Sequence, residues 1–182
     1  MKSIVTSSRL ILTIAAFVLH ASFASAQALS PSDIVPGIDG VMQKGEYAVM
    51  QSVQGFWLGA TLSRDRSTLT IGVAAQAGGW ISAGLGSRRM NGAYIVIAYD
   101  KSGKQVISED RGAGHKHSPV TYKKVLKSAV KTVNEQTVLE FSIQAADFIK
   151  GGKLQLILAT SNTADLFSFH PKFTSLEIPV IN

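Results

Sequence analysis

Short apolar segments separated by turn-forming residues run along most of the chain. The segment 137–144 (TVLEFSIQ) has the period of two that is typical of a strand with one buried face, because Leu139, Phe141 and Ile143 fall on one side. Other strand-like segments recur at intervals of about a dozen residues, namely 56–63, 68–74, 79–86, 93–99, 105–109, 153–160, 166–169 and 175–180. Turn residues between neighbouring segments, as at 100–104 (DKSGK), predict antiparallel hairpins.

The segment 122–133 has two interpretations. Val125, Ala129 and Val133 form a helical stripe, whereas its β-branched residues and the turn after it favour a strand. Residues 145–150 fit a single helical turn. About nine or ten short strands with almost no helix predict an all-β fold, an antiparallel immunoglobulin-like β-sandwich. Because no repeat or long linker divides the chain, we expect one domain over residues 27–182.

The first 26 residues have the composition of a secretory signal peptide. Lys2 and Arg9 accompany an apolar run at 10–19, which is too short to span a bilayer core of about 30 Å. The small residues at 24–26 (ASA) suit signal peptidase. We expect cleavage after Ala26, which leaves 182 − 26 = 156 residues and lowers the formal net charge from +6 to +4. No later segment is apolar enough to cross a membrane, so we expect a periplasmic or secreted protein.

The composition excludes several classes of protein and site. Apolar residues make up 46% of the chain, which excludes a disordered protein because enough apolar surface exists to offset the entropy of ordering. The chain has no cysteine, so disulfides, a thiolate nucleophile, cysteine-based metal sites and covalently attached haem are all excluded. No Ser-His-Asp set or phosphate-binding loop occurs. The adjacent carboxyls Glu109 and Asp110 would point to opposite faces of a strand, which argues against acid–base catalysis.

Several short motifs occur in an order that resembles one known family. In chain order they are Ile38-Asp39-Gly40, Gly45-Glu46-Tyr47, the segment 79–86 (GWISAGLG), the segment 90–99 (MNGAYIVIAY), Asp110-Arg111 and Phe167-Ser168-Phe169-His170. Their order and spacing resemble the DOMON family of exported β-sandwich domains that bind haem or sugars. The resemblance covers nearly all of residues 27–182 and implies the same sandwich fold for them.

In cytochrome-type members of that family, one Met and one His hold a non-covalent b-type haem. Carried over by position, these ligands fall on Met90 and His170, and the resemblance therefore implies haem b as the cofactor. With both axial positions filled, such a centre transfers electrons and leaves no open site for substrate. We therefore expect no enzymatic activity. Residues so far apart in sequence would face one pocket at the end of the sandwich.

Three cations lie close to these candidate ligands. Arg88 and Arg89 precede Met90 and could pair with haem propionates, although a solvated loop explains them equally well. Lys172 is a weaker candidate for the same role. The sequence departs from the family at Tyr94, where an Asp is common, and at Pro171, which restricts the backbone of the residue before it.

Two further features have a functional and a plainer interpretation. His115 and His117 form an H-x-H pair, which could bind copper or zinc or replace His170 as a ligand, but the glycines around it favour a solvated loop. The segment 111–131 contains six Lys or Arg and no acid. It could steer an acidic redox partner, although a solvated basic face is the plainer interpretation. The charges lack the interleaved aromatics of a nucleic-acid platform, so no nucleic-acid partner is expected. Trp80 is expected in the core and Trp57 near the surface.

Two hypotheses about function follow. In the first, the protein is an exported b-type cytochrome domain that passes electrons to a membrane cytochrome or an exported oxidoreductase. In the alternative, it is a haem-free DOMON module that binds carbohydrate or another small ligand.

Overall fold

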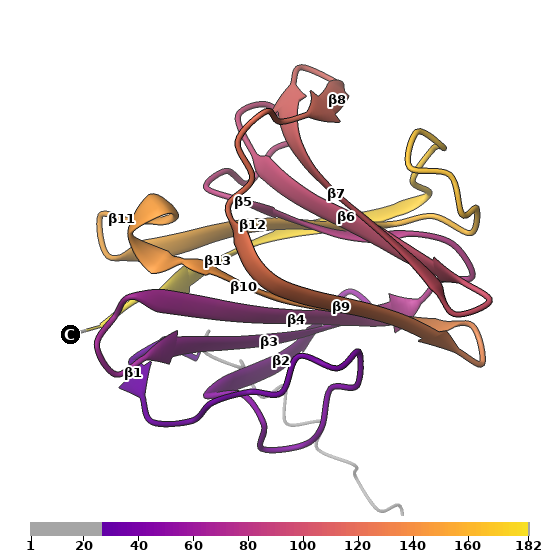
Figure 1. The fold of residues 1–182 in the computed structure, drawn as a ribbon. Helices are drawn as coiled ribbons and strands as arrows, with labels where there is room; N and C mark the ends of the chain where they lie inside the picture. Colours follow the sequence, from indigo (N-terminus) through magenta and orange to yellow (C-terminus); the bar gives the residue numbers. More distant parts are fainter. Residues whose placement is uncertain (1–26, 182) are drawn as a thin grey trace, which may run out of the picture.

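The computed structural model describes residues 27–181, so the predicted signal peptide at 1–26 lies outside the described residues. Within the described part, thirteen strands and one 3₁₀ helix form two sheets that pack face to face (Figure 1). In chain order they are β1 (Pro31–Ser32), β2 (Val49–Val53), β3 (Phe56–Ser63), β4 (Thr68–Gln76), β5 (Ile81–Leu85), β6 (Tyr94–Lys101), β7 (Lys104–Ala113), β8 (Lys116–Pro119), β9 (Val125–Val133), β10 (Gln136–Gln144), η1 (Ala145–Asp147), β11 (Ile149–Lys150), β12 (Lys153–Thr160) and β13 (Lys172–Pro179). The predicted all-β sandwich is confirmed.

The two sheets have simple, mostly antiparallel topologies. The six-stranded sheet has the order β1-β3-β4-β10-β9, with β2 also paired to β3, and only β1 runs parallel to its neighbour. The seven-stranded sheet has the order β11-β12-β5-β6-β7-β8, with β13 also paired to β12. Consecutive strands such as β3–β4, β6–β7 and β9–β10 form hairpins, as the turn residues between them predict.

A single large core fills the space between the sheets. Alternation along each strand sends every second side chain inward, and the fully buried residues include Phe56, Leu58, Ile71, Phe141, Ile81, Leu85 and Val96. Trp57, which is 52% exposed, lies on the outer surface as expected. A second apolar cluster lies on the opposite, outer face of the seven-stranded sheet and contains Trp80, Ala93, Ile95, Ile97 and Ala159. The expectation that Trp80 is buried is confirmed, but it belongs to this second cluster.

Several sequence predictions about individual elements need correction. The strand predicted at 166–169 is a turn, in which the Asp165 side chain and backbone oxygens accept hydrogen bonds from the amides of Phe167 and Ser168. Of the ambiguous segment 122–133, residues Val125–Val133 form a strand, β9. The short strands β1, β2, β8 and β11 were not predicted, which explains why the structure has more than the expected nine or ten strands. These strands are too short, or too polar, to show apolar alternation.

A buried carboxyl group ties the N-terminal segment to the six-stranded sheet. Glu140 of β10 is fully buried, and its Oε2 accepts hydrogen bonds from the backbone amides of Asp39, Gly40 and Val41. Its Oε1 accepts one from the Tyr47 hydroxyl at 2.6 Å. Burial and the neighbouring Glu140 raise the pKa of Tyr47, so the phenol remains a donor. These contacts explain why the 38–40 and 45–47 motifs occur together.

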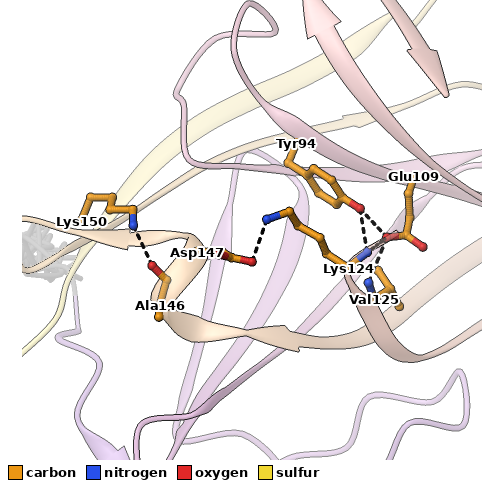
Figure 2. A network of polar contacts seen from close by, with 7 residues as sticks. All are labelled: Tyr94, Glu109, Lys124, Val125, Ala146, Asp147 and Lys150. Atoms are coloured by element: carbon orange, nitrogen blue, oxygen red, sulfur yellow. Dashed lines mark hydrogen bonds and ion pairs between the residues drawn. The ribbon is translucent and has the colours of Figure 1, made fainter. Parts of the chain in front are cut away.

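A second buried carboxyl group joins the two sheets. Glu109 of β7 accepts hydrogen bonds from the Tyr94 hydroxyl and from the backbone amides of Lys124 and Val125, where the chain enters β9 (Figure 2). The Lys124 ammonium pairs with Asp147 at 2.8 Å. Tyr94 therefore faces the core between the sheets, whereas Ile95 and Ile97 lie on the opposite face of β6.

Candidate functional site

The outer face of the seven-stranded sheet carries a cavity of about 340 Å³. Its floor consists of side chains that alternate with core residues along three neighbouring strands, namely Ser82 and Gly84 of β5, Ile95 and Ile97 of β6, and Ile157 and Ala159 of β12. Its walls are the loop after β5, the β7–β8 hairpin and the loop before β13. In Figure 1 the hairpin and the loop before β13 both rise above this sheet. The cavity therefore lies on the outer face of a sheet and not at the end of the sandwich.

Gly84 leaves space above the floor of the cavity because it has no side chain. A Cβ at Gly84 would lie 2.6 Å from Ile157 Cγ2 and 3.2 Å from Ala93 Cβ. Any larger residue would therefore push these neighbours aside and fill part of the cavity. This gives Gly84 of the GWISAGLG segment a structural reason, which the sequence alone does not supply.

Met90 is held at one wall by its own tight loop. The Met90 carbonyl accepts a hydrogen bond from the Ala93 amide at 3.0 Å, and the Gly92 amide donates to Gly112 of β7 at 3.0 Å. Gly112 lies directly against Met90, because a Cβ there would overlap the Met90 carbonyl and lie 3.1 Å from Met90 Cγ. The bare glycine thus allows the loop to lie on β7, and the half-buried Met90 side chain lines the cavity.

The loop before β13 is fixed to the sheet by Trp80. Trp80 Nε1 donates to Ser168 Oγ at 2.9 Å, and the same oxygen lies 3.0 Å from Ser161 Oγ. The Ser161 amide also donates to the Trp80 carbonyl at 2.9 Å. At the base of the loop, a Cβ on Gly79 would overlap the Thr163 backbone. These contacts set the position from which His170 enters the cavity.

His170 lies half-buried among aromatic rings just before β13. Its ring centroid is 5.6 Å from Phe169, 5.7 Å from Phe173 and 6.2 Å from Trp80. Burial lowers the pKa of His170, and the charge of nearby His117 lowers it further by a smaller amount. The imidazole is therefore favoured in its neutral form, the form that binds a metal.

His117 forms a third donor group in the same cavity, which corrects the solvated-loop interpretation of the H-x-H pair. It lies on β8, its side chain is 15% exposed, and Nδ1 is 2.5 Å from Oδ2 of buried Asp110. The Phe167 ring stacks on it at 5.8 Å and 8°. His115 also lines the cavity but is exposed. The sequence does not predict a strand at 116–119, because Lys, His, Ser and Pro show no apolar alternation.

The candidate cations differ in position. Arg88 and Arg89 are exposed beside Met90, and Arg88 is close enough to Glu177 to help lower the pKa of that carboxyl. Lys172 lies against the other sheet, because its ammonium donates to the Gly55 carbonyl at 3.0 Å and is 5.0 Å from the Phe56 ring centroid. The structure therefore brings together Met90 and His170, with the two arginines nearby, and directs Lys172 elsewhere.

The donor groups in the cavity suit a metal that is already coordinated by a cofactor. Among the described residues, no three His, Asp or Glu side chains converge to hold a bare ion. A haem supplies four equatorial nitrogens, so it requires only two axial donors from the protein. The thioether of Met90 and the imidazole of His170 are such donors. The volume of the cavity lies within the usual range for a cofactor site, about 300–1,000 Å³. The largely apolar floor is also typical of such sites.

Comparisons with known proteins identify the fold. No family model matches the chain, and no curated protein matches it either. Among solved structures, the cytochrome b domain of pyranose dehydrogenase from Coprinopsis cinerea matches with a TM-score of 0.54 at 14% identity, over 68% of this chain and 76% of that one. The cytochrome domain of Myriococcum thermophilum cellobiose dehydrogenase matches with a TM-score of 0.51 at 16% identity, over 72% and 79%. The chain therefore shares the β-sandwich fold of these two solved structures, which is the fold that the sequence motifs predicted.

Proposed function

We propose that the protein is an exported b-type cytochrome domain. It holds haem b non-covalently in the cavity on the seven-stranded sheet, with Met90 and His170 as axial ligands. It carries electrons to or from another protein and does not itself transform a substrate. Its partner is an exported oxidoreductase or a membrane cytochrome, in the periplasm or outside the cell.

The observation that carries this proposal is the convergence of Met90 and His170 on one apolar cavity. The two residues come from loops at opposite sides of the floor, and each loop is fixed by its own hydrogen bonds. The shared fold adds support, since both solved structures are named as cytochrome domains of dehydrogenases. Among the described residues, no helix is both long and apolar enough to cross a membrane.

The bound haem would supply a one-electron carrier. The protein residues have three tasks. Met90 and His170 would hold the group through its iron and would exclude oxygen or substrate from the metal. Ile95, Ile97 and Ile157 line the cavity and would keep water away from the macrocycle. A Met/His pair would raise the reduction potential above that of two imidazoles. Arg88 and Arg89 lie where they could neutralise the propionates.

A haem titration followed by optical absorption tests this function. We expect the purified protein to bind haem with a low-spin spectrum and a near-infrared band characteristic of thioether ligation to ferric iron. Met90→Leu should remove that band, and His170→Ala should weaken haem binding at least tenfold. Met42→Leu is the matched control, because Met42 lines a hollow on the outer face of the other sheet. A wild-type protein that stays colourless with excess haem would instead favour the ligand-binding alternative.

A further inference from the structure

His117 has the hydrogen-bonding arrangement of a metal ligand. Asp110 of β7 is 1% exposed, and its two carboxyl oxygens contact Ser108 Oγ and His117 Nδ1. A carboxylate oxygen can only accept, so Nδ1 carries the hydrogen, and in the neutral ring Nε2 keeps its lone pair. Histidines that bind metals usually donate their second ring nitrogen to a carboxylate in this way. Among the described residues, no hydrogen bond of this kind holds His170.

The topology also brings His117 next to Met90. His117 pairs with Gly112 across β7 and β8, and Gly112 is the residue on which Met90 lies. Asp110 and Gly112 are two positions apart on β7 and therefore share a face. The Phe167 ring, which lies three residues before His170, stacks on His117 at 5.8 Å. All three donors line one cavity.

From this geometry, and resting on the function proposed above, we propose that His117 is a third iron-ligating residue. It takes the axial position of Met90 when the thioether is released, so the site has two ligation states, Met90/His170 and His117/His170. A soft thioether suits ferrous iron, whereas imidazole suits the harder ferric ion. The exchange replaces one neutral donor with another, so no proton or electron moves in the step itself. Because thioether ligation raises the potential, the His117/His170 state has the lower reduction potential.

The test uses haem-loaded full-length protein in five forms: wild type, Met90→Leu, His117→Asn, Met90→Leu/His117→Asn and Met90→Leu/His115→Asn. Ferric spin state is measured by electron paramagnetic resonance, together with the reduction potential. We expect Met90→Leu to remain low-spin with a bis-imidazole signal and a lower potential. The double variant lacking His117 should become high-spin. The variant lacking His115 should match Met90→Leu, because His115 has no carboxyl partner among the described residues.

Three outcomes would overturn the proposal. A high-spin or haem-free Met90→Leu protein shows that no other residue replaces the thioether. A Met90→Leu protein whose low-spin signal persists without His117 shows that the replacing ligand is another group. In both cases a wild-type protein with the thioether band leaves the proposed cytochrome function intact. A wild-type protein that binds no haem overturns both proposals. Circular dichroism of each variant establishes that the fold is retained.

Discussion

At the scale of single residues, glycines decide where the large side chains lie on the outer faces of both sheets. On the six-stranded sheet, Tyr47 lies flat over Gly59 and Gly72, where a Cβ would come within 2.5 Å of its ring or hydroxyl. On the seven-stranded sheet, Gly112 leaves room for the Met90 loop. An added methyl group at such a site forces a shift in closely packed neighbours.

Gly112→Ala should therefore displace Met90. The new Cβ would overlap the Met90 carbonyl, which belongs to the backbone and cannot move aside as a flexible side chain could. We expect the thioether band of the haem-loaded protein to be lost and unfolding stability to fall by about 1–3 kcal/mol. Gly78→Ala is the control, because its Cβ would meet only one atom, at 3.9 Å. An unchanged near-infrared spectrum in Gly112→Ala would contradict this role for Gly112.

The histidine that we assign to the haem should titrate unusually in the haem-free protein. Burial and the charge of His117 both lower the pKa of His170, so its midpoint should lie below the ordinary value of about 6.5. His117→Asn removes one of the two causes, and the midpoint should move back upward. Two-dimensional NMR of the imidazole resonances measures both values. A midpoint at or above 6.5 in the wild type would show that the environment of His170 differs from that described.

At the scale of elements, buried carboxyl groups fasten segments that have little apolar surface of their own. Glu140 holds residues 39–41 against β10, and Glu109 holds the entry to β9. Each carboxyl accepts hydrogen bonds from several buried or partly buried backbone amides, and such amides need acceptors. The N-terminal segment is thus positioned by polar contacts, whereas strands such as β10 are positioned by packing.

Glu140→Gln should lower the stability of the fold, because it weakens the hydrogen bonds that Glu140 accepts. The amide has only one acceptor oxygen, so it cannot receive both the Tyr47 hydroxyl and the three backbone amides as the carboxyl does. We expect a loss of about 1–3 kcal/mol in unfolding free energy, measured by urea denaturation. Glu135→Gln, in the exposed β9–β10 turn, should change it by less than about 0.5 kcal/mol. Equal stability of the two variants would contradict the structural role of Glu140.

The strands that sequence reasoning found are those whose pairing buries one or both faces in apolar contacts. β3, β4, β6 and β10 are long and apolar enough for alternation to be visible. β8 is recognisable only from the structure, because its sequence KHSP shows no apolar alternation. The reverse error occurred at 166–169, where alternating Phe residues line the cavity from a turn.

At the scale of the whole molecule, one sandwich serves two purposes. The space between the sheets is a closed core that must supply the stability of a chain without disulfides. The outer face of the seven-stranded sheet carries the site, so changes there need not disturb the core. Phe167 and Phe169, which are 73% and 79% exposed, mark the open side of the cavity.

Haem should therefore stabilise the folded protein without being required for folding. A ligand that binds only the native state at a free concentration of 100 times its dissociation constant adds about 2.7 kcal/mol. We expect the melting temperature to rise on adding haem and the effect to disappear in Met90→Leu/His117→Asn/His170→Ala. A haem-free protein without a cooperative melting transition would contradict an independent core.

The site was only partly predictable at this scale. Met90 and His170 could be nominated because the motifs that contain them are recognisable in sequence. The contribution of His117 depends on Asp110 in a neighbouring strand and on the register between β7 and β8, which no local pattern shows. Lys172 lies two residues after His170 in sequence, yet its side chain reaches Gly55, because its direction is set by the pairing of β13.

The most direct test of the central claim is a crystal structure of the haem-loaded protein. We predict one haem per chain on the outer face of the seven-stranded sheet, above Ile95 and Ile157, with the iron coordinated by His170 on one side. In the reduced crystal the second ligand should be the sulfur of Met90. Haem bound elsewhere, or iron coordinated by neither Met90 nor His170, would contradict the proposed function.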